Sequence, residues 1–249
     1  MMNITPVVKQ LLIINIIFFI GSQLVPVAES YFALYYFENP MFKFWQPLSH
    51  MFMHGGLMHI FFNMFALYSF GSALEHFWGG NKFLFFYISC GLGAALLHSF
   101  INYLEFRNEL SYLLDSGFKK EDVLSLLNQN MFDQRWLNVI GQDGVDALSI
   151  SYHVPAVGAS GAVYGLLVAF AFMFPNAELA LMFIPIPIKA KYFVPGLLAI
   201  DLFLGFKGSS IFGAGSTGIA HFAHIGGALT GFIMMWYWKK NQFNHKRWN

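Results

Sequence analysis

The sequence predicts an all-α membrane protein, folded as a bundle of six transmembrane helices. Of its 249 residues, 57% are hydrophobic and only 11% are charged, whereas a soluble domain carries about 25% charged residues. The mean hydropathy is positive, at +0.53. Six segments also approach the length of about 20 mostly apolar residues with which a helix crosses a bilayer. Because lipid offers no hydrogen bonds to backbone groups, each segment is expected to be a helix.

The six expected spans cover residues 7–25, 55–74, 82–103, 158–174, 192–206 and 219–238. The fourth span is short, because a helix of about 17 residues rises roughly 25 Å and cannot fill a hydrocarbon core of about 30 Å. Its first turn is therefore expected below one membrane surface, where it must face protein or a water-filled cavity.

The basic residues predict the orientation of the bundle. One side would hold Lys9, Lys82, Lys189, Lys191, Lys239, Lys240, Lys246 and Arg247. The opposite short loops hold only Lys43 and Lys207. We expect a multi-pass integral membrane protein in a bacterial inner membrane, with both termini cytoplasmic. A formal net charge of +1 gives no sign of nucleic-acid binding, and the single cysteine, Cys90, excludes an intrachain disulfide.

A polar stretch separates the third and fourth spans, at residues 104–155. It carries eight acidic and four basic residues, which suits the external side of the membrane. Two sets of apolar residues within it each share one helical face: Leu110, Leu113 and Leu114, then Val123, Leu126 and Leu127. With Gly117 as a helix stop between them, we expect two short amphipathic helices lying over the external surface. The chain is interpreted as one membrane domain, 1–249, with this external insert.

Three polar clusters lie in or beside the apolar spans, where polar side chains are costly and usually functional. The first is the string GASG, which opens the fourth span and contains Gly158, Ser160 and Gly161. Its small residues would let a substrate backbone approach the hydroxyl, and the free N–H groups of a helix N-terminus can stabilise negative charge. Taken alone, the string is also typical of small-residue packing between helices.

The second cluster places His224 deep in the sixth span, followed by Gly227 and Gly231. The two glycines form a GxxxG face that permits close approach to another helix. If that helix is the fourth span, His224 can reach Ser160. In isolation, this histidine is equally consistent with a hydrogen bond to a passing carbonyl group.

The third cluster runs along the start of the second span as His50, His54, His59 and Asn63. His59 and Asn63 are four residues apart, so they share one helix face and can both donate hydrogen bonds to an oxyanion. Histidines at such spacings can also bind zinc, and they can simply cap the preceding loop. One hydroxyl, one imidazole and a pair of donors are together the groups needed for acyl transfer.

Three strings, HGGLMHIFFN (54–63), GASGAVYG (158–165) and AHIGGALTG (223–231), together resemble the rhomboid family of intramembrane serine proteases. Their order and their placement on the second, fourth and sixth spans match the family, and the resemblance covers residues 7–238 apart from the insert. It implies a Ser–His dyad without an acid, formed by Ser160 and His224. It also implies an oxyanion site made by His59, Asn63 and the backbone N–H of Ser160.

The same resemblance implies supporting roles for three further residues. Tyr164 matches the position whose ring packs on the catalytic histidine, and His54 matches a structural histidine near the site. Glu75 matches an acid that ties a loop to the bundle. The sequence departs from the family at Trp45-Gln46, where Trp-Arg is frequent, and in its longer insert before the fourth span.

The sequence therefore predicts a serine endopeptidase that hydrolyses peptide bonds in or near the transmembrane segments of other proteins. The expected partners are transmembrane substrates and membrane lipid, with no cofactor, metal or nucleic acid. Two rival interpretations are a catalytically inactive relative that binds membrane clients and a transporter that uses intramembrane histidines. The presence of both Ser160 and His224 disfavours the inactive form. A transporter would more naturally show inverted repeats, and none is evident.

Overall fold

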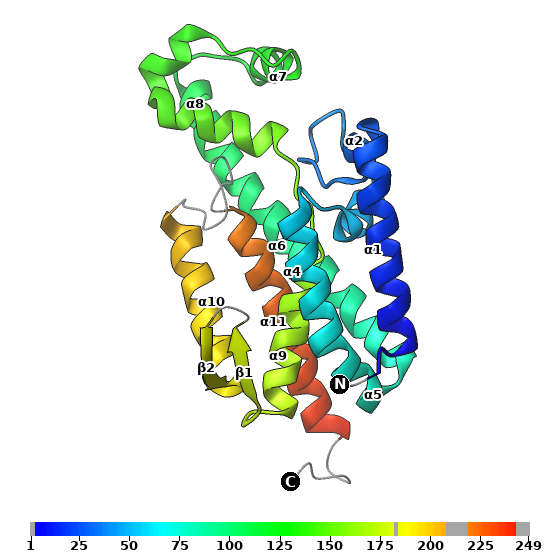
Figure 1. Ribbon diagram of the computed structural model, residues 1–249. Helices are drawn as coiled ribbons and strands as arrows, with labels where there is room; N and C mark the ends of the chain where they lie inside the picture. The colour runs from blue at the N-terminus through cyan, green and yellow to red at the C-terminus, as the bar shows by residue number, and fades with distance from the viewer. Residues whose placement is uncertain (1–2, 182–183, 208–218, 243–249) are drawn as a thin grey trace.

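The computed structural model describes residues 3–181, 184–207 and 219–242, and it is mostly helical (Figure 1). In chain order its helices are α1 (Pro6–Leu24), α2 (Val27–Phe32), α3 (Gln46–Ser49), the 3-10 turn η1 (His50–Phe52), α4 (Leu57–Ala66), the π-helical turn η2 (Leu67–Gly71), α5 (Ser72–Trp78), α6 (Gly80–Asp115), α7 (Lys120–Asn128), the 3-10 turn η3 (Gln134–Trp136), α8 (Leu137–His153), α9 (Ser160–Met173), α10 (Ala190–Lys207) and α11 (Ile219–Gln242).

Three helical stretches in the described residues are long and apolar enough to cross a membrane: Pro6–Leu24, Leu57–Trp78 and Gly80–Asp115. Ser160–Met173 is apolar but shorter. The other two expected spans correspond to α10 and α11, so the count of six stays a prediction. The second of the three stretches joins α4, η2 and α5 without a break, and Gly79, at φ +78°, then turns the chain into α6.

The third expected span is much longer than predicted. Helix α6 runs without a break for 36 residues, which is about 54 Å. A separate amphipathic helix around Leu110 was therefore a wrong prediction, because that segment continues the span. The expected stop at Gly117 is confirmed: φ is +92°, its N–H bonds to the carbonyl of Leu114, and that of Phe118 bonds to the carbonyl of Leu113. This is a Schellman end, which needs a left-handed residue.

The insert has a small hydrophobic core of its own, at the end of the bundle opposite the start of α1 (Figure 1). The predicted second amphipathic helix is confirmed as α7. It packs with α8 and the end of α6 around buried apolar residues that include Leu113, Val123, Leu127, Trp136 and Leu148. The insert thus stands on the extension of α6, and the position of α7 over the external surface stays a prediction.

The insert is also fastened to the loop between α2 and α3. Lys120 pairs with Glu38 at 2.9 Å, and Asn39 donates to the carbonyl of Tyr152 at 2.8 Å. The backbones of Leu34 and Ala156 exchange two hydrogen bonds, of 2.9 and 2.8 Å. These contacts fix the segment that leads into α9.

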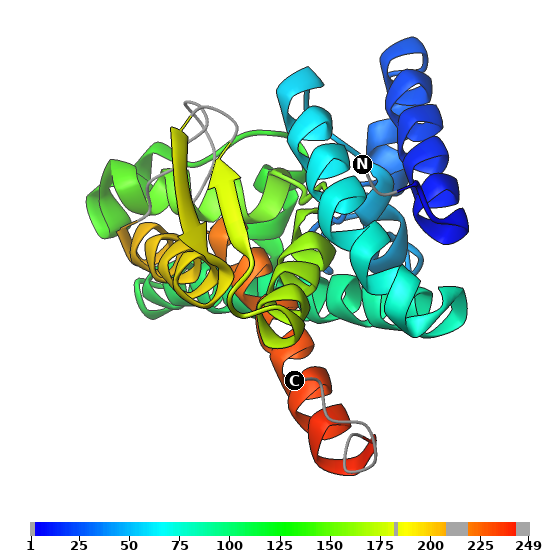
Figure 2. The ribbon, with the colours of Figure 1, turned by 60° about the horizontal axis from the view of Figure 1, so that its bottom comes forward.

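The fold also contains a feature that the expectation of an all-α protein missed. Strands β1 (Glu178–Leu181) and β2 (Ile184–Lys189) pair antiparallel, with Glu178 opposite Lys189 and Leu179 opposite Ile188. The hairpin lies beside α10 at one edge of the molecule, whereas α1 lies at the opposite edge (Figure 2). The hairpin, the start of α1 and the end of α11 lie at the same end of the bundle (Figure 1).

Helix α9 lies in the centre of the bundle and packs on both α6 and α11, which also pack on each other. Glycines make the contacts closest to its backbone: a Cβ built on Gly227 would overlap the carbonyl oxygen of Gly161, and one on Gly231 would lie 2.9 Å from the Cα of Gly165. A Cβ on Gly161 would in turn overlap Ala94 of α6. The GxxxG face of α11 therefore packs on α9, so the helix left open by the sequence is the fourth expected span.

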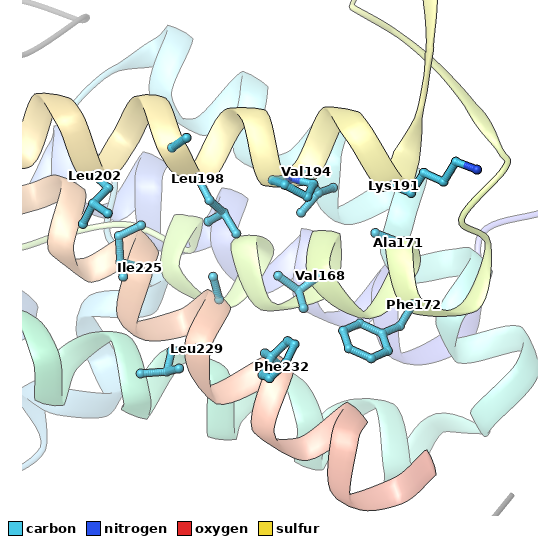
Figure 3. A pocket seen from close by; sticks show the side chains of 13 residues that line it. Val168, Ala171, Phe172, Lys191, Val194, Leu198, Leu202, Ile225, Leu229 and Phe232 are labelled. Carbon is cyan, nitrogen blue, oxygen red and sulfur yellow. The ribbon is translucent and has the colours of Figure 1, made fainter. Parts of the chain in front are cut away.

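Helix α10 packs on α9 through an apolar cluster that includes Val168 and Val194. At its start, the N–H groups of Ala190 and Lys191 donate to the carbonyls of Ala177 and Pro175. Between α10, α9 and α11 lies a cavity of about 580 Å³ with nearly all-apolar walls, such as Val168, Leu198 and Phe232 (Figure 3). Toward the other end of α10, the attachment is polar and belongs to the site described below.

Glu75 of α5 fastens the start of α1. Its carboxylate accepts hydrogen bonds from the hydroxyl of Thr5 at 2.5 Å and from the backbone N–H groups of Val7 and Val8 at 2.9 and 2.8 Å. A carboxylate is favourable at a helix N-terminus, where the first N–H groups lack partners within the helix. The acid therefore anchors a helix, whereas the family resemblance implied that it anchors a loop.

Candidate active site

Ser160 is the first residue of α9, and the turn before it requires glycine. Gly158 has φ +128°, and its N–H donates to the carbonyl of His50 at 2.9 Å. A Cβ at Gly158 would lie 2.8 Å from Nε2 of His59 and 3.5 Å from Oγ of Ser160. The hydroxyl and the His59 ring therefore border the same point, and the missing side chain of Gly158 keeps that point open.

His224 of α11 reaches Ser160 directly. Its Nε2 lies 2.9 Å from Oγ of Ser160, which is hydrogen-bond distance. The close contact of Gly161 with Gly227 makes this approach possible, because it brings the backbones of α9 and α11 together. The ring of Tyr164 stacks on the imidazole, with the centroids 4.2 Å apart and the planes 9° from parallel. The structure thus brings Ser160, His224 and Tyr164 into one group.

His59 and Asn63 of α4 stand beside this pair in different ways. Nδ1 of His59 accepts a long contact of 3.4 Å from the N–H of Gly55, which leaves Nε2 as the proton-bearing atom beside Gly158. Asn63 is buried, and its amide nitrogen donates to the carbonyl of His59 at 2.9 Å. Within the described residues, the Asn63 amide forms no hydrogen bond to Ser160, so its part in an oxyanion site stays a prediction.

His54 lies behind His59. Its ring is buried and stands edge-on to the His59 ring, with the centroids 5.1 Å apart. Neither ring nitrogen has a hydrogen-bond partner within the described part of the chain. The residue lines a small polar cavity of about 110 Å³ with Ser22 and Glu29, which is large enough for water.

The structure adds an acid that the sequence analysis did not single out. Asp201 of α10 is buried, and its Oδ1 lies 2.5 Å from Nδ1 of His221 and 3.3 Å from Nδ1 of His224. A signal was present in the sequence, because a lone acid within an apolar span is costly and usually functional. The dyad expected to have no acid therefore has a carboxylate next to its histidine.

These three side chains are also the candidate metal ligands. Among the described residues, Asp201, His221 and His224 form the one group whose ligand atoms all lie within 4.8 Å of one another. The histidines between positions 50 and 59, for which zinc binding was the competing interpretation, form no such group in the described part of the chain.

A half-buried hydroxyl–imidazole pair between two helices of an apolar bundle defines a class: a helical membrane protein with the parts of a hydrolase site. The rhomboid domain family matches residues 41–111 and 130–241, which is well over half of the chain. The chain therefore belongs to the rhomboid family. The residues that the match leaves out in the middle belong to the insert.

Comparisons with individual proteins agree with this assignment. The human protein "Presenilin-associated rhomboid-like protein, mitochondrial" is 25% identical over 236 residues, covering 90% of this chain and 48% of the relative. "Rhomboid protein 1, mitochondrial" of Saccharomyces cerevisiae is 23% identical over 194 residues, covering 76% and 40%. "Rhomboid protease GluP" of Bacillus subtilis is 33% identical over 54 residues, covering 22% and 11%. The chain spans about half the length of the mitochondrial relatives that it matches.

Family and apolar helices together identify an integral membrane protein. The relatives reported above include mitochondrial proteins and a bacterial one. They do not support the bacterial inner membrane over a mitochondrial membrane.

Proposed function

We propose that the protein is an intramembrane serine protease that cuts transmembrane proteins with Ser160 as nucleophile and His224 as base. The observation that carries this proposal is the hydrogen bond of 2.9 Å between Nε2 of His224 and Oγ of Ser160. Such a contact between a nucleophile and a base is the signature of activated serine. The protease name of one relative adds support.

The reaction follows from the positions of these two side chains. Oγ of Ser160 bonds to the scissile carbonyl carbon while its proton passes to Nε2 of His224. The C–N bond then breaks, and the same proton goes to the leaving amine. A water molecule, deprotonated by His224, attacks the resulting ester, releases the acid and restores the Ser160 hydroxyl.

The negative charge of the tetrahedral intermediate would be held by donors around Ser160. The first N–H groups of α9 have no intrahelical partner and are available there. Nε2 of His59 faces the same point, and the second hydrogen of the Asn63 amide is not needed for the bond to His59. We assign the oxyanion site to His59, Asn63 and the Ser160 N–H.

The experiment that tests the function uses purified protein in liposomes with a single-span reporter substrate. We expect two reporter fragments and labelling of the protein by a fluorophosphonate probe, neither affected by EDTA. An inactive client-binding relative would bind the reporter without cutting it and would not be labelled. A transporter would neither bind the reporter nor be labelled. Loss of labelling on EDTA treatment would contradict serine chemistry and favour a metal site.

The proposed architecture is the single six-span domain predicted from the sequence, with α9, α10 and α11 completing the bundle. The insert then lies outside the membrane, and both termini lie on the cytoplasmic side of a bacterial inner membrane, or on the corresponding side of another membrane. The insert lies at one end of the bundle, and the β1–β2 hairpin, with basic residues around it, lies at the opposite end, which supports this orientation (Figure 1).

Single cysteines at positions 125 and 240 test this orientation. Ser125 and Lys240 are exposed, whereas the native Cys90 is buried and should stay silent. In intact cells that carry the protein in the plasma membrane, an impermeant maleimide should label S125C and not K240C. K240C should become labelled when the cells are permeabilised. Labelling of K240C with protection of S125C in intact cells would reverse the topology.

Replacing Asn63 with alanine should slow cleavage by roughly 10²–10³, because the other oxyanion donors remain. The substrate affinity should change little, since the lost bond forms mainly in the transition state. Kinetics on one transmembrane substrate in detergent measure both quantities for Asn63→Ala, with His59→Ala alongside. An unchanged rate constant with weakened binding would make Asn63 a packing or docking residue.

A further inference from the structure

Asp201 lies inside the bundle with two imidazoles against one of its oxygens. Its side chain is 5% exposed, and those of His221 and His224 are 10% and 23% exposed. A buried carboxylate is costly unless it is paired and hydrogen-bonded. Both contacts go to Oδ1, whereas Oδ2 has no hydrogen-bond partner in the described residues.

The contact with His224 determines which ring nitrogen carries the proton. A carboxylate oxygen accepts, so Nδ1 of His224 must donate to Asp201. In a neutral imidazole the other nitrogen, Nε2, is then the acceptor. Nε2 is the atom that lies 2.9 Å from Oγ of Ser160, so the ring is held in the tautomer that can take the serine proton.

The surroundings of His224 favour the same arrangement. The groups that face it are Ser160 and Tyr164 from α9, Asp201 from α10, His221 one turn earlier on α11, and His59 from α4, which is close enough to interact with it electrostatically. Asp201 is the one carboxylate in this set of described groups. It can therefore stabilise the imidazolium that forms when the serine proton arrives.

We propose that Asp201 is a positioning residue of this active site, which fixes the tautomer and orientation of His224 and stabilises its charged form. The inference rests on the proposed protease function. During the reaction the proton moves from Oγ of Ser160 to Nε2 of His224 and then to the leaving amine. Asp201 keeps its charge throughout and exchanges no proton. His221 completes the arrangement by holding the carboxylate from the adjacent turn of α11.

Asp201 also attaches α10 to α11 through its contacts with His221 and His224, so the test must separate positioning from folding. Asp201→Asn keeps the size of the side chain and removes its charge. We expect kcat for the reporter to fall by about 10²–10⁴, with KM nearly unchanged. The thermal unfolding temperature should stay close to that of the wild type. Asp143→Asn, the same change at an exposed acid of the insert, is the matched control and should alter nothing.

A spectroscopic measurement reports the tautomer directly. Nitrogen-15 spectra of histidine-labelled protein in lipid, assigned by comparison with His224→Gln, should show Nε2 of His224 unprotonated in the wild type. Asp201→Asn should give a mixture of tautomers. If Asp201→Asn does not fold, Asp201→Glu, which retains a carboxylate, should keep more activity and more of the wild-type tautomer than Asp201→Ser.

The outcomes are distinguishable. A wild type that neither cuts the reporter nor labels would refute the proposed function itself. A cutting wild type whose Asp201→Asn variant retains full kcat and the wild-type tautomer would overturn only this inference. Inhibition of the wild type by EDTA with recovery on added Zn²⁺ would also overturn it, because the three side chains would then be ligands.

Discussion

Ser160→Ala is expected to lower the rate constant for cleavage by on the order of 10⁶ and to abolish fluorophosphonate labelling. Among the described residues, the Ser160 hydroxyl is the one that forms a hydrogen bond with His224, so it is the group placed to supply the attacking oxygen. Substrate binding should survive, since the hydroxyl contributes little to it. Initial rates on a transmembrane reporter, with KM fitted separately, measure the effect.

The double variant Ser160→Ala with His224→Ala sharpens this prediction. Residues that act as one unit lose their whole effect when either is removed, so the double variant should be no slower than each single variant. Ser125→Ala, at an exposed position of α7, is the matched serine control and should cleave at the wild-type rate. Rate losses that multiply in the double variant would mean that Ser160 and His224 act independently.

Gly227→Ala is expected to destabilise the protein and to disable the site together. The new Cβ would overlap the carbonyl oxygen of Gly161 and lie 2.6 Å from the carbonyl carbon. Both are backbone atoms, so α11 must move away from α9. Overpacking in a core costs about 1–3 kcal/mol, and the upper end is expected where no side chain can yield. A shift of about 1 Å between catalytic groups can also cost roughly 10² in rate.

The matched control for this glycine is Gly196→Ala in α10, where nothing lies within 4 Å of the added atom. Alanine is the better helix former, so this variant should be neutral or more stable by about 0.5–1 kcal/mol. Thermal unfolding in detergent and the rate of probe labelling, measured on both variants, compare the two positions. Equal unfolding temperatures and equal labelling rates would show that α9 and α11 do not depend on glycine at their contact.

The polar pair between α9 and α11 could be predicted from the sequence because its parts were locally marked. The small residues of GASG and the glycines after His224 are both patterns typical of close helix packing. A helix face made of glycines commonly packs on another face of small residues. Asp201 was not found in this way, although it stood within the expected fifth span. Its meaning depends on which helix α10 packs against, and no local pattern around a single acid contains that information.

The limits of the helices could be predicted only where a residue stops a helix. The polar residues after position 104 suggested the end of the third span. Polar residues allow a helix to continue from lipid into water, however, and do not end it. The left-handed Gly117 does end it. The hairpin was missed because Pro185 and Pro187 argue against a central strand. A two-stranded hairpin has only edge strands, which tolerate proline.

The unbroken helix α6 contributes both to the insert and to one wall of the active site. About 30 Å of its length of about 54 Å would suffice to cross the hydrocarbon core, so more than a third is left to stand outside. Near its middle, Ala94 touches the position of Gly161. A helix with no hinge transmits a push as a tilt of its whole length. A load on the insert would therefore tilt α6 and shift Ala94 against Gly161, the residue next to Ser160.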